Sequence, residues 1–226
     1  DLGLVTTGGL DGHIAVWKLT VKQSTFGYYA QLDCLREYSL QDPEVDSVCY
    51  SVQSLCMGSV VENSFSILIG IQSGDIYELN YEEDSDNDTL AKVLKSIDAE
   101  VLCSISCDAT SSFIYTLSKS GVFTVWDIES LAQVYCRDFA KKAARVIAFQ
   151  SKHYVLLAFE EEVVVMQLSS ESDEEINYEL LGGFIIQAKN LTDVALSIEE
   201  ECLAVASNPE QKPQVDIYLV HSQVFK

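Results

Sequence analysis

A short unit of sequence recurs five times along this chain, and this recurrence constrains the fold more than any other feature. Each copy has an apolar run, a tight turn and a second run of alternating apolar and polar residues, which is the pattern of a β-hairpin. The turn pairs of the first four copies are Asp11-Gly12, Ser73-Gly74, Ser120-Gly121 and Glu160-Glu161, and a longer loop with Pro209 and Pro213 replaces the pair in the fifth. Repetition of one hairpin indicates an array of similar sheets.

Each hairpin also carries a large side chain at the same place. Counting five residues past the second turn residue, and assigning the long-loop copy by analogy, reaches Trp17, Leu79, Trp126, Met166 and Tyr218. Successive positions are 62, 47, 40 and 52 residues apart, and the acidic run 82–88 and the loop 208–213 are identifiable inserts. A unit of about 40 residues is typical of one four-stranded propeller blade. We interpret these five positions as blade-core positions.

Further apolar stretches before and after the hairpins complete the units. The innermost strands are expected at 45–52, 101–106, 144–149 and 192–198, and the outer strands at 28–37, 90–94, 133–138 and, more weakly, within 176–186. Small and branched residues in the first set suit strands that are buried on both faces. A helix over 90–97 is the competing interpretation of that stretch, and a strand is preferred.

The chain is therefore predicted to be all-β, a partial WD-repeat β-propeller with about five four-stranded blades of a seven-bladed ring. One domain spans 1–226, with blade-like units at about 1–40, 41–97, 98–140, 141–187 and 188–226. The first unit lacks its innermost strand and the last lacks a convincing outer strand. Because an open propeller leaves sheet edges exposed, we expect further residues to supply about two more blades. A self-contained ring of five blades is the alternative.

Composition limits the kinds of partner. The formal charge is −21, but 15 of the 35 acidic residues lie in four short runs, at 82–88, 160–162, 171–175 and 199–201, which are expected to be solvated turns. Nucleic acid is not an expected ligand, because binding phosphates needs clustered Lys and Arg. No apolar run is long enough to span a membrane. Seven cysteines, an odd number mostly within strand-like runs, indicate a reducing compartment such as the cytoplasm.

Several segments resemble a known family. The endings "VWKL" and "VWDI" resemble those of WD repeats, and only Trp126-Asp127 supplies the literal dipeptide. The segments "ILIGIQSGDIYELN", "IYTLSKSGVFTVWDIES", "FAKKAARVIAF" and "LAVASNPEQKPQVDIYLV", in this order, are similar to the second propeller of echinoderm microtubule-associated protein-like proteins. The resemblance covers 2–220 and leaves the acidic inserts unmatched.

This resemblance implies a non-catalytic scaffold without cofactors that binds tubulin, microtubules or neighbouring microtubule-associated proteins. It also implies a place on the cytoskeleton, including the axoneme of cilia. The hydrophobic signature segment and first propeller of the family have no counterpart in this chain, so contacts made through them do not carry over. A general adaptor propeller in a coat, transport or ubiquitin-ligase complex is the alternative function.

One basic cluster stands out in the acidic chain. Lys141, Lys142 and Arg145 lie between an expected outer strand and the next inner strand, in a connection that reaches one propeller face. They are a candidate patch for docking on acidic tubulin, because screening beyond about 8 to 10 Å lets a local patch act independently of the net charge. The competing interpretation is an ordinary solvated turn.

No metal site is predicted. Asp84, Asp86 and Asp88 match the first three ligand spacings of a calcium loop, but Thr89 stands where the motif needs Gly and Lys95 where it needs Glu. A solvated acidic loop is the preferred interpretation.

Catalysis is not predicted either. Cys103 and Cys107 lack a CxxC spacing and would face the same side of a strand, which favours core packing over zinc. His13, His153 and His221 are scattered, and no nucleophile elbow or phosphate loop accompanies them. An enzyme would need carboxylates and histidines that converge only in the fold.

Overall fold

The computed structural model describes residues 3–40, 50–61, 64–83, 85, 87–94, 101–108, 112–149, 154–172, 175–197 and 199–219, with backbone alone for 61 and 168–185. These residues form five antiparallel sheets that follow one another along the chain. Each sheet is a meander in which consecutive strands pair. The prediction of an all-β propeller is confirmed.

The first and last sheets have three strands each. The first is ordered β1 (Gly3–Gly8), β2 (His13–Ser24) and β3 (Gly27–Ser39), and the fifth is ordered β16 (Leu191–Leu196), β17 (Cys202–Ser207) and β18 (Gln214–Leu219). Among the described residues, the first sheet thus lacks an innermost strand and the fifth lacks an outermost strand.

The three middle sheets have four strands each. Sheet 2 contains β4 (Val52–Val61), β5 (Ser64–Ile71), β6 (Ile76–Glu82) and β7 (Thr89–Leu94). Sheet 3 contains β8 (Leu102–Cys107), β9 (Phe113–Ser118), β10 (Val122–Asp127) and β11 (Gln133–Asp138). Sheet 4 contains β12 (Ala143–Ala148), β13 (Tyr154–Phe159), β14 (Glu162–Ser172) and β15 (Glu175–Gln187). The only helix in the described ranges is the short 3-10 turn η1 (Pro209–Gln211), so none there could cross a membrane.

The first sheet of four corrects one prediction. Its innermost strand is β4, Val52–Val61, which shares only Val52 with the expected range 45–52, because pairing with β5 selects the later stretch. Val52 pairs with Ile71 and Leu55 with Ile69. Residues 41–49 lie outside the described part. At 89–94 the chain is strand β7, so the helical alternative is wrong for that stretch.

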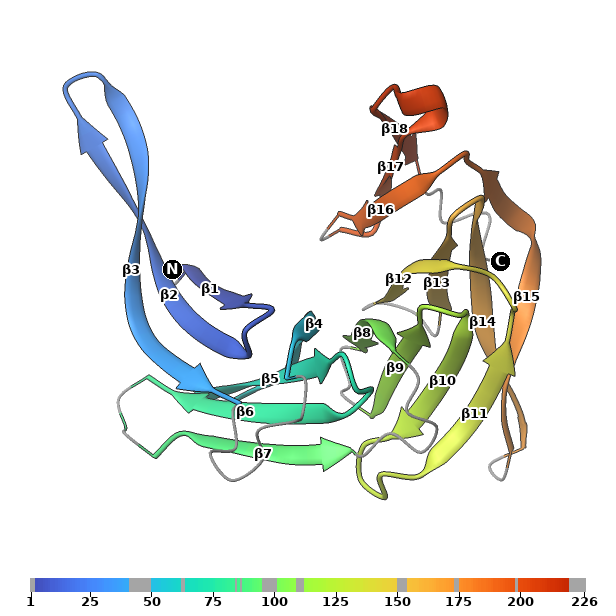
Figure 1. Cartoon of the computed structure of the whole chain (residues 1–226), viewed down its shortest axis with the longest axis horizontal. Coiled ribbons are helices and arrows are strands. Elements are labelled where there is room, and N and C mark those ends of the chain that lie inside the picture. Colours follow the sequence, from blue (N-terminus) through green and yellow to red (C-terminus); the bar gives the residue numbers. More distant parts are fainter. Residues whose placement is uncertain are drawn as a thin grey trace.

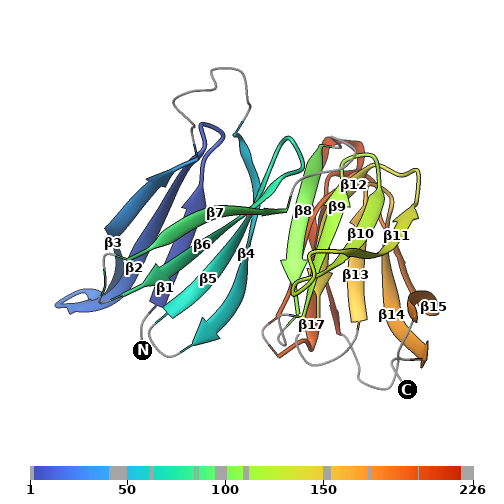
Figure 2. The ribbon, with the colours of Figure 1, turned by 90° about the horizontal axis from the view of Figure 1, so that it is seen from below.

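The five sheets stand side by side around an open arc, with β4, β8, β12 and β16 nearest its centre (Figure 1). Seen at 90° to that view, β8, β9 and β10 run from one face of the arc to the other (Figure 2). The first and fifth sheets are separated by an opening (Figure 1). The alternative of a closed ring of five blades is therefore wrong.

Apolar clusters between neighbouring sheets hold the arc together. Representative fully buried pairs are Ile14 with Ile69 between sheets 1 and 2, Ile76 with Ile114 between sheets 2 and 3, Leu117 with Val155 between sheets 3 and 4, and Leu156 with Leu203 between sheets 4 and 5. Within the described residues no such cluster joins sheet 5 to sheet 1. Every sheet is thus packed on both faces except the two at the ends.

Candidate functional site

The candidate site lies on one face of the arc, where several connections meet. In an up-and-down meander, the turn between the second and third strands lies at the same end as the connection to the next sheet. The connection 139–142 from β11 to β12, the turn Glu160-Glu161 from β13 to β14, and the connection 188–190 from β15 to β16 therefore share one face. We call this the loop face.

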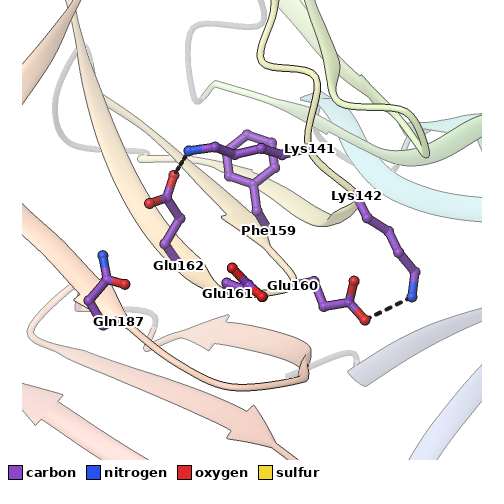
Figure 3. Close-up of a pocket in the computed structure, with 7 residues that line it drawn as sticks. All are labelled: Lys141, Lys142, Phe159, Glu160, Glu161, Glu162 and Gln187. Carbon is purple, nitrogen blue, oxygen red and sulfur yellow. Dashed lines mark hydrogen bonds and ion pairs between the residues drawn. The ribbon is translucent and has the colours of Figure 1, made fainter.

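A cavity of about 230 Å³ opens on the loop face, where the connection from sheet 3 meets sheet 4. It is lined by Lys141, Lys142, Phe159, Glu160, Glu161, Glu162 and Gln187 (Figure 3). The Lys141 ammonium pairs with the Glu162 carboxylate, and the Lys142 Nζ lies 3.0 Å from Glu160 Oε1. The Lys141 Nζ also lies 5.9 Å from the ring centre of the buried Phe159.

A second cavity of about 460 Å³ adjoins the first and reaches sheet 5. The two cavities share Glu161 and Gln187, and the second is otherwise lined by Ala188, Lys189, Ser207, Pro209, Gln214 and Asp216. We call the pair of cavities the loop-face groove. Glu161 lies at its middle, and the structure shows no ion pair for this carboxylate among the described residues.

The three predicted basic residues are not one patch. Lys141 and Lys142 line the groove, whereas Arg145 lies in β12 itself and not in the connection. Arg145 Nη1 lies 2.9 Å from both carboxylate oxygens of Asp193 on β16. All three cations are thus paired with carboxylates of their own chain, and the groove also carries the unpaired Glu161. The sequence did not associate the acidic turn with this site.

The two tryptophans at the blade-core positions make the same hydrogen bond. The indole Nε1 of Trp17 donates to the Thr7 hydroxyl at 2.9 Å, and that of Trp126 donates to the Thr116 hydroxyl at 3.1 Å. In both cases the threonine lies ten residues earlier, on the preceding strand. The two sites are therefore structurally equivalent.

Four blade-core side chains face the preceding sheet. Leu79 and Met166 are fully buried there, and the partly buried Trp126 and Tyr218 pack against the corresponding clusters. Trp17 occupies the equivalent place in the first sheet, and the described residues form no sheet before it.

The calcium-loop residue within the described part has another role. The Asp88 carboxylate accepts hydrogen bonds from the Tyr38 hydroxyl, from Arg36 Nη1 and from the Glu82 backbone N–H, the last at 3.0 Å. Burial opposes ionisation of Asp88, but the hydrogen bonds from Tyr38 and Arg36 outweigh it and lower the pKa of this carboxyl. Asp88 thus links sheet 1 to sheet 2. Asp84, Asp86 and Lys95 lie outside the described residues.

Cys103 and Cys107 point to different sheets. The Cys103 Sγ lies 3.1 Å from the Ala144 carbonyl oxygen on sheet 4, whereas the Cys107 Sγ lies 3.7 Å from the Cys56 Sγ on sheet 2. The expectation that they face the same side is wrong, because the strand pairing of β8 shifts register between Leu102 and Ser104.

Of the three scattered histidines, one lies in the described part of the chain. His13 is exposed at the start of β2, and His153 and His221 lie outside the described residues. No group of three or more His, Cys, Asp or Glu side chains suitable for a metal ion occurs in the part of the chain that the structure describes.

Comparison with known proteins supports the fold alone. No protein-family model and no curated protein sequence matches the chain. Among solved structures, the propeller domain of Cps50 (Swd1) from Myceliophteria thermophila is similar, with a TM-score of 0.59 and 13% identity over 96% of this chain and 79% of that one. The chain has the fold of a β-propeller.

Two further structures show the range of proteins with this fold. A chain of the mitotic checkpoint complex is similar with a TM-score of 0.55 and 12% identity, covering 76% of this chain and 49% of that one. A protein assigned as a 6-phosphogluconolactonase from Bacteroides uniformis has a TM-score of 0.63 and 10% identity, covering 98% of this chain and 66% of that one. This chain thus spans less than two thirds of either of these two chains.

Proposed function

We propose that this chain is a non-catalytic protein-interaction scaffold that binds a segment of a partner protein in the loop-face groove. The observation that carries this proposal is the pair of adjoining cavities, which share Glu161 and Gln187 and extend from the connection between sheets 3 and 4 to sheet 5. Rigid sheets hold the loops that line the groove, and loops positioned by a rigid scaffold commonly carry binding. The likeness to propellers supports the same reading.

The charges of the groove favour a partner with a basic residue. Lys141 and Lys142 are already paired with Glu162 and Glu160. The other charged lining residues are Glu161 at the middle of the groove and Lys189 and Asp216 in the second cavity, so carboxylates outnumber cations among them. A Lys or Arg side chain of the partner would pair with Glu161 and gain a charge-assisted hydrogen bond.

The partner we propose is a microtubule-associated protein on the cytoskeleton or the ciliary axoneme. The support for this class is the resemblance of four sequence segments to echinoderm microtubule-associated protein-like proteins. Direct contact of the basic residues with acidic tubulin is less favourable, because Lys141, Lys142 and Arg145 would first have to leave their own carboxylates. A neighbouring microtubule protein with a basic segment fits the groove better.

Sedimentation with microtubules tests this proposal. We expect the chain to pellet with microtubules that retain their associated proteins and to stay mostly in solution with purified tubulin polymer. Glu161→Lys should reduce pelleting at least about tenfold, because it places like charges together at the groove. Glu129→Lys is the matched control, since it makes the same charge change on the exposed β10–β11 turn.

Two results would overturn the microtubule proposal. One is recovery of the chain in the supernatant in both preparations, also when it is joined to a flanking propeller. The other is pelleting that Glu161→Lys and Glu129→Lys reduce equally, since a loss of that kind would reflect net charge and not the groove.

An adaptor in another multiprotein assembly is the second candidate function. The observation that favours it is the likeness of the fold to a chain of the mitotic checkpoint complex. The same groove would then bind a basic segment outside the cytoskeleton. Binding that depends on Glu161 but needs no microtubule would support this candidate.

The absence of catalysis is also a proposal that can be tested, since one similar structure is assigned as a lactonase. We expect the purified chain to leave the rate of 6-phosphogluconolactone hydrolysis at that of buffer. Acceleration that persists through repeated purification would contradict a purely binding function.

A further inference from the structure

The two end sheets of the arc each present an apolar face that equivalent sheets bury. In β18, Val215, Ile217 and Leu219 are 65%, 72% and 65% exposed. They pair with Ala206, Ala204 and Cys202 on β17, so all six side chains share one face of sheet 5. This face points away from sheet 4, because Leu203 and Val205 on the opposite face pack against sheet 4.

Position within the repeat shows what such a face normally contacts. Val215 and Ile217 lie three residues and one residue before the blade-core residue Tyr218. The equivalent pairs in three other sheets are Ile14 and Val16 before Trp17, Phe123 and Val125 before Trp126, and Val163 and Val165 before Met166. All six counterparts are 0% exposed and pack against the following sheet. The exposed face of sheet 5 is therefore equivalent to the faces on which a following sheet packs elsewhere in the arc.

The first sheet shows the complementary face. Trp17 stands where Leu79, Trp126, Met166 and Tyr218 each pack against a preceding sheet. Val5 pairs with Trp17 on the same face, and the apolar side continues along β2 through Leu19 and Val21. Val21 is 67% exposed.

The strand edges at the two ends of the arc are also uncovered in the described structure. In the described structure, β1 has no inner neighbour, whereas its counterparts β5, β9, β13 and β17 pair with β4, β8, β12 and β16. Likewise β18 has no outer neighbour, whereas β6, β10 and β14 pair with β7, β11 and β15. Each end thus offers both a sheet edge for strand pairing and a sheet face for packing.

We infer that further propeller blades pack against the two end faces and close the ring. These blades are carried by polypeptide joined to this chain. Such polypeptide would add an inner strand at β1, an outer strand at β18, and complete sheets between them. Polypeptide joined to this chain is favoured over a second copy, because strands that are consecutive along the chain pair in every sheet of the arc.

Hydrogen exchange tests this inference on the 226-residue chain and on the polypeptide isolated from its source. We expect β1 and β18 to exchange at least about tenfold more slowly in the source polypeptide, because their edges and faces are then covered. Strands β9 and β13, which are covered in both, should exchange alike. Equal exchange of β1 and β18 in the two samples, or a source polypeptide of only 25.1 kDa, would overturn the inference.

A double substitution provides an independent test. Val215→Ser with Ile217→Ser should change the melting temperature of the 226-residue chain by less than about 2 °C, since both side chains are already exposed, but lower that of the source polypeptide by about 5 °C or more. Lys212→Ser, at an exposed position shortly before β18, is the control and should affect neither. Protection of β18 from hydrogen exchange that appears only as the concentration of the 226-residue chain rises would show that a second copy covers this face. That result would contradict closure of the ring by further blades.

Discussion

At the scale of single residues, glycine in the turns between strands sets how closely neighbouring sheets approach. Gly121 has a φ of +100°, in the region that L side chains rarely adopt. A Cβ at this position would lie 2.3 Å from the carbonyl oxygen of Lys141, in the connection that forms the groove. The conformation of the turn between β9 and β10 and the close approach of the connection that lines the groove therefore both require glycine at position 121.

Substituting this glycine should be costly for two separable reasons. Gly121→Ala is expected to lower the free energy of unfolding by about 2 to 4 kcal/mol, from backbone strain together with the clash against Lys141. Gly27→Ala is the control, because Gly27 has a φ of +133° and nothing within 4 Å of its Cβ position. The control should cost at most about 1 kcal/mol. Equal losses in urea unfolding would show that the clash with Lys141 contributes nothing.

Asp88 gives a prediction with a defined pH dependence. Its pKa is lower in the folded chain than the ordinary 3.8, so its hydrogen bonds with Arg36 and Tyr38 stabilise the fold fully above about pH 4. This contribution is lost as the pH falls through the folded pKa, which lies below 3.8. Asp88→Asn should cost about 1 to 2 kcal/mol at pH 7.

Urea unfolding at pH 7 and pH 3 checks this expectation. The difference between Asp88→Asn and the unsubstituted chain should shrink at the lower pH, because the carboxyl is then increasingly neutral in both states. Glu129→Gln, at an exposed turn, should have little effect at either pH. A difference for Asp88→Asn that stays constant with pH would contradict the role of its charge.

At the scale of elements, the hairpin of β2 and β3 is longer than a blade requires. Beyond Trp17 it extends from the arc as an arm, Leu19 to Leu32 (Figure 1). Leu19, Val21, Tyr28 and Leu32 lie on one side of the arm, while Lys18, Thr20, Lys22, Gln31 and Asp33 lie on the other. On this polar side, the Lys18 Nζ lies 3.6 Å from Glu83 of sheet 2.

Shortening the arm should leave the fold intact. Replacing 20–31 by Asn-Gly joins Leu19 to Leu32 through a two-residue hairpin turn. The melting temperature should change by less than about 3 °C, because the removed side chains are largely exposed and bury little apolar area. Binding of a hydrophobic dye should fall, and loss of cooperative melting would instead show that the arm supports sheet 1.

Elements also show where sequence patterns succeed. The strand expected at 133–138 is β11 without change, because its alternating residues lie between clear turns. The strand expected at 45–52 is displaced to Val52–Val61, because both stretches suit a strand and pairing with β5 decides between them. In the same way, β15 is a full strand from Glu175 to Gln187, although its sequence pattern is weak.

At the scale of the whole molecule, stability should decrease from the middle of the arc to its ends. Sheets 2, 3 and 4 pack on both faces, whereas sheets 1 and 5 pack on one. Arrays of units that contact only their neighbours open first at the ends. In the 226-residue chain we expect β9 and β13 to have the slowest hydrogen exchange and β1 and β18 the fastest. Uniform exchange across the five sheets would contradict this gradient.

The sequence by itself determined the repeat, and with it the type of fold. Tight turns at regular places and large side chains such as Trp17 and Trp126 are local signals. One sequence is therefore sufficient to predict five sheets and the missing strand at each end. The tertiary structure alone decided the candidate site. Lys141 and Glu162, or Arg145 and Asp193, are brought together by packing between strands and sheets, and such pairings leave no periodic mark in the sequence. For the same reason, only the structure showed that the basic cluster is neutralised and that the exposed faces of sheets 1 and 5 match buried faces elsewhere in the arc.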